Sequence, residues 1–270
     1  MTSEYKMPGP LLSIIIANFN KELYLGDCLN SILSQSYEHI EIIIADDLST
    51  DSSVEIIKEY EKKFPKKIKC LFNGTHSGVT YTRHHAILNS TGSYITTLDS
   101  DDYYFDLRKL EKEMALLWVY KEQKGQDIIA FSNIVLVQEN KTMMGIWGTA
   151  ENIREGHILT PIMGRNCLIP RDFVMSRDAY FHVGGYDLTI PIYEDWDLKI
   201  RLAAKYAFYF TGINGTAYRR HGKGLSSLPV PEHEKWLTFI YEKNRHLTDG
   251  ENNSLIQHGL EEYINLLRHS

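Results

Sequence analysis

The apolar residues of the first 125 positions alternate between short continuous runs and helical spacings. Residues 11–17 form an apolar, β-rich run that predicts a buried strand, and Leu25, Cys28, Leu29 and Ile32 then recur at helical spacing. We expect a helix over residues 21–35. The pattern continues with strands over 40–45, 68–72 and 93–98, and with helices from about 52, over 79–89 and over 106–121.

This order of elements predicts an α/β fold. Four strand–helix units in a row imply a mostly parallel sheet with helices on both faces. Ligands of such sheets bind at the carboxyl ends of the strands. A polar cluster follows each predicted strand, over residues 18–20, 46–51, 73–78 and 99–102. We therefore expect one binding site at that rim.

The pattern changes after residue 125. Residues 127–138 and 141–147 predict a strand pair, whereas residues 148–192 are rich in turn formers and hold no long helix. Short strands are expected near 168–175 and 206–211, followed by two amphipathic C-terminal segments. The expected organisation is an α/β half over 1–125, a mixed half of the same domain over 126–230, and a helical extension over 231–270.

Composition and charge exclude several classes of protein. The chain has 270 residues, 43% of them hydrophobic, and a net charge of −6 without a basic run, so we expect no nucleic-acid partner. Cys28, Cys70 and Cys167 have no metal-binding spacing, which favours a reducing cytoplasm over a disulfide framework. No apolar run approaches the roughly 20 residues of a membrane helix. We expect a soluble, cytoplasmic protein that is at most peripheral to a membrane.

An acidic loop follows the fourth predicted strand. Asp99, Asp101 and Asp102 place three carboxylates within four residues, and like charges this close repel unless a cation is present. Mn²⁺ or Mg²⁺ takes such oxygen ligands and bridges to phosphates. The alternative is a solvated turn whose acids cap a helix. Neither a P-loop nor a G-x-G-x-x-G motif is present, so bound phosphates would be neutralised by metal and side chains.

Five segments together resemble a known family. They read SIIIANFN over 13–20, ADDLSTD over 45–51, LDSDD over 98–102, GGYD over 184–187 and YEDWD over 193–197. In this order and spacing they are similar to glycosyltransferase family 2, the large inverting group with the GT-A fold. The resemblance covers at least residues 11–118 and resumes at residue 184.

The resemblance implies a nucleotide site in the first half. Ala17 and Phe19 match first-strand positions that contact the base, and Phe19 keeps a ring where the family usually has tyrosine. Asp47 matches the residue that accepts a hydrogen bond from N3–H of uracil, so Asp46 would be structural or a secondary contact. Arg83 matches a basic residue near the ribose and diphosphate.

The same resemblance implies a metal site. Asp99 and Asp101 form the D-x-D pair, and Asp101 or Asp102 should bind the metal. His221 lies where some relatives have a loop that offers a histidine to the metal; the alternative is an exposed, idle side chain. Three neighbouring basic residues could assist the leaving diphosphate or form a solvated basic turn: Arg219, Arg220 and Lys223.

Asp195 matches the catalytic base of the family's E-D motif. We expect Tyr193 and Trp196 to supply an apolar environment that raises its pKa. The alternative is that Glu194 and Asp195 merely start a helix, where acids favour the dipole.

The implied activity is sugar transfer, with inversion, from a nucleotide diphosphate sugar to a hydroxyl acceptor. The donor would be a uridine-linked hexose or N-acetylhexosamine. The acceptor would be a saccharide or lipid-linked saccharide of a surface polysaccharide, which would bring the enzyme to the inner membrane face. The C-terminal segments could dock there or pair two subunits, although packing against the domain is the simpler expectation. The alternatives are nucleotidyl transfer, which the absence of glycine from residues 17–21 disfavours, and an inactive sugar-nucleotide-binding module.

Overall fold

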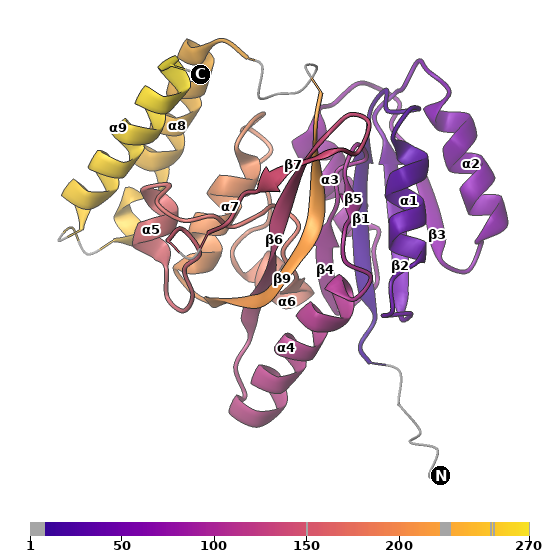
Figure 1. Cartoon of the computed structure of the whole chain (residues 1–270), viewed down its shortest axis with the longest axis horizontal. Coiled ribbons are helices and arrows are strands. Elements are labelled where there is room, and N and C mark those ends of the chain that lie inside the picture. The colour runs from indigo at the N-terminus through magenta and orange to yellow at the C-terminus, as the bar shows by residue number, and fades with distance from the viewer. Residues whose placement is uncertain (1–8, 150, 222–227, 249, 251, 270) are drawn as a thin grey trace.

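The first sheet contains the four predicted strands, and they run parallel (Figure 1). The computed structural model describes residues 9–149, 151–221, 228–248, 250 and 252–269. The strand order is β3-β2-β1-β4-β8, and β8 is antiparallel to β4. The strands are β1 (Leu12–Asn18), β2 (Ile40–Asp46), β3 (Ile68–Phe72), β4 (Tyr94–Thr97) and β8 (Met175–Ser176). The predicted α/β class is confirmed.

Alternate residues of the strands enter two separate cores. Ile14 and Ile16 belong to one apolar cluster, and Ile15 between them belongs to the other, because successive side chains of a strand point to opposite faces. The first cluster also holds residues of α1 (Leu25–Leu33), α2 (Ser53–Lys63) and α4 (Lys109–Lys124). The second holds residues of α3 (Val79–Leu88) and of the C-terminal half. Both faces of the sheet are therefore covered.

A second sheet follows in the order β5-β9-β6-β7. Its strands are β5 (Tyr103–Tyr104), β9 (Ala207–Arg220), β6 (Ile128–Gln138) and β7 (Met143–Ile146). The predicted pair of β6 and β7 is confirmed and is antiparallel. Two shorter predictions were wrong in extent. The strand expected near 168–175 is reduced to β8. The strand expected near 206–211 continues to Arg220, because its backbone pairs with β6 across a register shift that accommodates Gly212.

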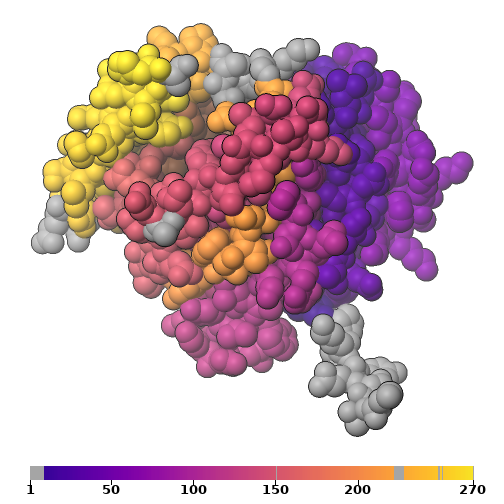
Figure 2. All heavy atoms as spheres, in the orientation of Figure 1, coloured from indigo at the N-terminus to yellow at the C-terminus, as the bar shows by residue number. Residues whose placement is uncertain are grey.

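The C-terminal half adds five helices to the part of the chain that the structure describes. They are α5 (Leu159–Met163), α6 (Arg177–His182), α7 (Glu194–Ala203), α8 (Val230–Asn244) and α9 (Asn253–His269), with a 3₁₀ turn at η2 (Arg245–Leu247). The absence of a long helix from the described part of 148–192 is as predicted. In Figure 2, α8 and α9 form the end of the molecule opposite the purple N-terminal helices. Ile256 and Leu260 of α9 are buried, so this helix packs on the domain.

No helix among the described residues combines the length and apolarity needed to cross a membrane.

A buried ion network joins α4 to the second sheet. The Lys109 ammonium is fully buried and lies 2.7 Å from a Glu113 carboxylate oxygen and 3.2 Å from Asp172. Thr216 of β9 donates to the same Asp172 carboxylate, and Ser132 of β6 donates to Glu113 at 2.8 Å. Buried charges persist only when paired and hydrogen-bonded in this way. The network also fixes the loop that contains Arg171, the neighbour of Asp172.

Candidate active site

The carboxyl ends of β1 and β2 are tied together by side chains. The register places Asn18 beside Asp46, and the Asn18 amide donates to the Asp46 carboxylate at 2.8 Å. The Ser49 backbone N–H and hydroxyl donate to the same carboxylate at 2.9 and 2.6 Å. Asp46 therefore stabilises the turn after β2, in keeping with the structural role considered for it. Ala17, at the end of β1, keeps partial exposure at the rim.

Asp47 is buried at the start of that turn, and its carboxylate accepts several hydrogen bonds. The Asn73 amide and the Ser77 backbone N–H donate to Oδ1 at 2.8 and 2.9 Å, and the Gly78 backbone N–H donates to Oδ2 at 2.8 Å. His76 Nδ1 lies 2.9 Å from Oδ2. Burial acts to raise the pKa of Asp47, but the hydrogen bonds from Asn73, Ser77, Gly78 and Thr82 outweigh it and lower the pKa below its ordinary value. The carboxylate is thus ionised at neutral pH.

Phe19 lies directly beyond β1 with 40% of its surface exposed. Its ring faces the His76 imidazole at a centroid distance of 4.2 Å. Phe19 and Asp47, two of the three residues predicted to contact a base, are therefore neighbours at one end of the rim, and His76 touches both.

Arg83 connects the nucleotide half of the chain to the C-terminal half. Its guanidinium is buried and binds two carboxylates, those of Asp99 after β4 and Glu194 at the start of α7. Arg171 binds the second oxygen of Asp99. Burial alone would lower the pKa of Arg83, but Asp99 and Glu194 raise it, so the arginine stays charged. This chain of ion pairs brings Glu194 and its neighbour Asp195 to the acidic loop.

The carboxylates of the acidic loop lie in different environments. Asp101 Oδ2 lies 2.6 Å from Lys21 Nζ and 2.9 Å from His221 Nε2. Burial acts to raise the Asp101 pKa, but Lys21 and His221 lower it. Asp102 is buried and accepts from the Arg219 backbone N–H at 2.8 Å. Its pKa is raised well above the ordinary value by burial and by the charges of Asp101 and Asp99.

This arrangement fits a divalent cation. Carboxylate oxygens of Asp99, Asp101 and Asp102 lie within 4.8 Å of one another. Burial first, and then the charges of Asp101 and Asp99, raise the pKa of Asp102, and a bound hard cation would favour its ionised form. Since Arg83 and Arg171 already hold both Asp99 oxygens, Asp101 and Asp102 are the better ligands. His221 also fits, because 9% of its side chain is exposed and its Nδ1 has no partner among the described residues.

The basic residues around His221 are placed differently from the prediction of a loop. Arg219 and Arg220 belong to β9, and the Arg219 guanidinium donates to Asp27, to the Asp101 carbonyl and to the Glu139 carbonyl. Arg219 therefore fixes the acidic loop and has little freedom to follow a leaving group. Lys223 lies outside the described residues.

Asp195 lies in the first turn of α7, beside the Arg83 and Arg171 charges. Its Oδ2 is 2.7 Å from Lys199 Nζ, one turn along the helix. The expectation of a raised pKa was wrong. Burial does act to raise it, but Lys199 and Arg171 outweigh burial and lower the Asp195 pKa below its ordinary value. Trp196 is buried in the core, where its indole N–H donates to the Ile162 carbonyl at 2.7 Å.

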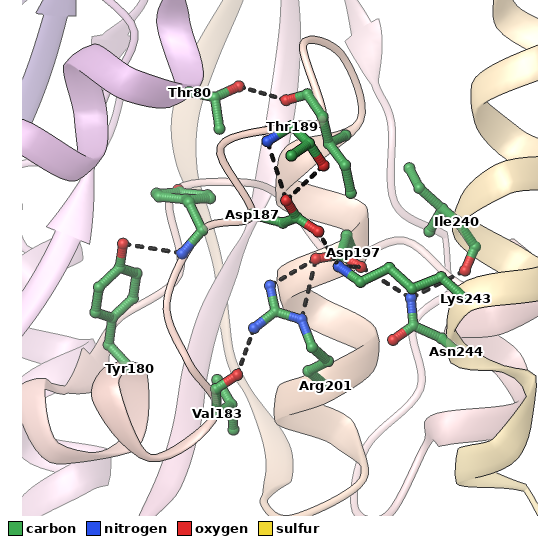
Figure 3. A network of polar contacts seen from close by, with 12 residues as sticks. Thr80, Tyr180, Val183, Asp187, Thr189, Asp197, Arg201, Ile240, Lys243 and Asn244 are labelled. Carbon is green, nitrogen blue, oxygen red and sulfur yellow. Dashed lines mark hydrogen bonds and ion pairs between the residues drawn. The ribbon is translucent and has the colours of Figure 1, made fainter.

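A polar network anchors α7, the helix that carries Asp195, to α8 (Figure 3). Asp197 is fully buried and accepts from Arg201, Lys243 and Asn244. Lys243 also binds Asp187 at 2.6 Å. These contacts join the G-G-Y-D segment, α7 and α8, so the E-D segment rests on a rigid support rather than on a loop.

Four residues at this site escaped the sequence prediction: Lys21, His76, Arg171 and Lys199. His76 lies inside the predicted polar cluster 73–78, and Lys21 directly follows the cluster 18–20, so their positions in the sequence could have suggested both residues. Lys199 follows Asp195 at i, i+4, a spacing that indicates pairing once the segment is known to be helical. Arg171 lies in an irregular loop, and no local pattern indicates that it reaches Asp99.

Comparison with known proteins agrees with the motifs. The model of "Glycosyl transferase family 2" matches residues 13–174. An uncharacterized glycosyltransferase of Haemophilus influenzae is 44% identical over 108 residues, which cover 40% of this chain and 42% of that protein. EpsE of Bacillus subtilis strain 168, which has a provisional glycosyltransferase name, is 39% identical over 40% of this chain and 39% of its own length. The chain thus matches about 40% of the length of these relatives.

The fold has solved counterparts. The structure of S. aureus TarS 1–349 in complex with UDP-GlcNAc superposes with a TM-score of 0.69 at 17% identity, over 94% of this chain and 71% of TarS 1–349. The complex of the same protein with UDP gives a TM-score of 0.67 at 16% identity. At this identity the likeness concerns the fold, and it confirms the expected GT-A architecture. Because the family model matches residues 13–174, this chain belongs to glycosyltransferase family 2.

Proposed function

We propose that the protein transfers a sugar from a UDP-linked donor to a hydroxyl group of a saccharide or lipid-linked saccharide, with inversion at the anomeric carbon. The observation that carries this proposal is the ion-pair chain Asp99–Arg83–Glu194, which joins the acidic loop to the E-D segment. It joins the acidic loop, the proposed diphosphate-binding region, to the segment of Asp195, the proposed base. The UDP and UDP-GlcNAc complexes of TarS support a uridine-linked donor by analogy of fold.

The nucleotide is proposed to bind at the ends of β1 and β2. Asp47 is ionised and has the acceptor oxygens that N3–H of uracil needs, and Phe19 provides an exposed ring face next to it. Arg83 is held charged by its two carboxylates and contributes positive potential towards the diphosphate. A base with an acceptor in place of N3–H, such as cytosine, would leave the Asp47 carboxylate facing another acceptor, which is unfavourable.

Asp101, Asp102 and His221 are proposed to hold Mn²⁺ or Mg²⁺. When bound, the cation supplies positive charge for the leaving diphosphate. Lys21 and His221 bind Asp101 in the structure, so both side chains already place positive or proton-donating groups at this carboxylate. We expect Lys21 to remain close and to share the stabilisation of developing negative charge.

Asp195 is proposed to act as the base. Its carboxylate takes the proton of the acceptor hydroxyl while the acceptor oxygen attacks the anomeric carbon. The bond to the nucleoside diphosphate breaks on the opposite face, and the configuration inverts. Lys199 lowers the Asp195 pKa and holds the carboxylate ionised and oriented through the 2.7 Å contact. The proton transfer is favoured late in the displacement, when the attacking hydroxyl has become acidic.

Nucleotide binding tests the proposal directly. We expect UDP to raise the melting temperature in the presence of Mn²⁺, and to do so more than GDP or CMP, because binding to the folded state stabilises it by mass action. Titration calorimetry gives the affinities. A tenfold preference for GDP, about 1.4 kcal/mol, would contradict the uridine assignment. UDP release from a panel of UDP-sugars then distinguishes an active transferase from an inactive binding module.

A further inference from the structure

One side chain, His76, covers both residues that are proposed to bind the nucleobase. Its imidazole lies on the Phe19 ring at a centroid distance of 4.2 Å, with 35° between the planes. Its Nδ1 lies 2.9 Å from Asp47 Oδ2 and 3.2 Å from the Asp47 carbonyl oxygen. Both partners of Nδ1 are acceptors, so Nδ1 must hold the proton and donate it. His76 therefore presents an aromatic ring to Phe19 and a ring N–H to Asp47.

These two interactions are the ones proposed for uracil. Uracil would also place a flat ring against Phe19 and donate a ring N–H to Asp47. We propose that His76 occupies the base site in the nucleotide-free protein and that the nucleobase binds by displacing it. This inference rests on the proposed function, since it concerns how the same site receives its uridine nucleotide.

The hydrogen bonds of Asp47 show why a displacement is required. A carboxylate offers about four lone-pair positions. Asn73, Ser77 and Gly78 donate to this one, Thr82 adds a further hydrogen bond, and His76 Nδ1 lies 2.9 Å from Oδ2. The uracil N3–H can approach the carboxylate well only where His76 Nδ1 now lies.

The groups that contact the Asp47 carboxylate, apart from His76, are part of the folded framework. Ser77 and Gly78 donate through their backbone N–H groups at the start of α3, where Gly78 has a φ of +85°. The Asn73 side chain is buried and is also tied to Thr82 and His85. Releasing any of these three would require the loop to rearrange.

His76 is free to leave. Its side chain is 54% exposed, against 3% for Asp47, and it can rotate into solvent without any change of the backbone. The base cannot insert between His76 and Phe19 while His76 stays in place. The two ring centroids are only 4.2 Å apart, which leaves no room for a third ring between them.

The inference predicts a gain of affinity on removal of the imidazole. If only a fraction of the molecules has an open base site, the apparent Kd of the nucleotide is increased by the inverse of that fraction. If the base site is open in about a tenth to a third of the molecules, the apparent affinity for the nucleotide is reduced by roughly three- to tenfold. We therefore expect His76→Ala to bind UDP about three- to tenfold more tightly than the wild type. A side chain that merely contacted the base would give the opposite sign.

The experiment is a titration of UDP by calorimetry, in Mn²⁺, for the wild type and for His76→Ala. Thr75→Ala is the matched control, since Thr75 is an exposed residue of the same loop and its hydroxyl bonds only to Ser77 among the described residues. Inorganic pyrophosphate serves as a second probe. It has no base, so its affinity should be equal in the two proteins, whereas a general change of the loop or of the charge would alter both ligands.

Tighter UDP binding by His76→Ala alone, with unchanged pyrophosphate binding, supports the displacement. Equal or weaker UDP binding by His76→Ala overturns it, provided that the wild type binds UDP. Failure of the wild type to bind UDP overturns the proposed function and this inference together, so the two failures are distinguishable. A ¹⁵N spectrum of the histidine rings gives a check on the wild type: UDP should move the His76 Nδ1 signal towards that of an exposed imidazole, and an unmoved signal contradicts the displacement.

Discussion

Replacing Asp195 by asparagine separates a catalytic base from an acid that only starts a helix. Asparagine has nearly the shape of aspartate and retains an acceptor for Lys199, but it cannot take a proton at neutral pH. A positioned general base contributes about 10²–10⁴-fold to the rate. We expect UDP release from a UDP-sugar to fall by at least about 100-fold, which corresponds to roughly 2.7 kcal/mol of barrier.

The structural cost of this substitution is limited. Lys199 would lose a charged partner at 2.7 Å but would keep its bond to the Ile169 carbonyl at 2.8 Å. A hydrogen bond between charged groups contributes about 1.5–3 kcal/mol. For a domain of this size, that loss lowers the melting temperature by roughly 3–12 °C. Asp195→Asn should therefore be folded at 20 °C, and its turnover can be expressed per folded molecule.

The assay combines three measurements on the same preparations. Circular dichroism gives the folded fraction, calorimetry gives the affinity for UDP, and coupled detection of UDP gives turnover. The residues proposed to hold the nucleotide, Asp47 and Arg83, bond to other partners, so UDP affinity should stay within about twofold of the wild type. Lys199→Met is the matched variant. It removes the main charge that lowers the Asp195 pKa, so the acid limb of the rate profile should move to higher pH.

A folded Asp195→Asn protein that releases UDP at a rate near that of the wild type would refute the role of Asp195 as the base. An acid that only starts a helix predicts that result, with a loss of about 0.5–2 kcal/mol of stability and no loss of turnover. Parallel loss of UDP affinity and turnover would instead place Asp195 with the donor-binding residues.

Three further predictions concern the metal and the ion pairs. Removal of metal by EDTA should weaken UDP binding, and Asp101→Ala should abolish most of that metal dependence; unchanged affinity and turnover in EDTA would exclude a metal site. Lys109→Met should destabilise the fold by about 3–5 kcal/mol in urea unfolding, because it leaves the buried Glu113 carboxylate without its counter-charge; a change below about 1 kcal/mol would contradict the role of this network. Burial acts to raise the pKa of Asp187, but Lys243 and Thr189 lower it to about 2. Because the folded pKa lies below the unfolded one, this stabilisation is present above pH 4 and is lost as the pH falls towards 2, so Asp187→Asn should remove about 2 kcal/mol of that acid dependence; equal acid profiles of the two proteins would show that the pair does not contribute.

Much of the fold could be predicted because its signals are local. Ile14, Ile15 and Ile16 form a run that only a strand covered on both faces can bury, and Leu25 to Ile32 repeat with the period of a helix. The carboxyl ends of parallel strands meet at one edge whatever the details of packing. The positions of Asp47 and of the acidic loop therefore followed from the order of the elements.

Strand β9 shows where local signals fail. Its glycines, Gly212 and Gly215, weaken the strand pattern, and the prediction ended before them. In the structure, hydrogen bonds to β6 carry the strand on to Arg220, immediately before His221. Pairing with a partner some 80 residues away in sequence overrides local propensity, as is usual for strands.

The sequence by itself determined the fold class, the family and many of the residues that gather at the rim. The tertiary structure decided which other residues join them and how they pair. Arg171 reaches Asp99 across 72 residues of sequence, and Arg83 reaches Glu194 across 111. The pKa of Asp195 is lowered rather than raised, since a Coulomb field depends on distances in space that the spacing of residues does not reveal. For the same reason, only the folded chain shows that His76 lies on Phe19 and Asp47.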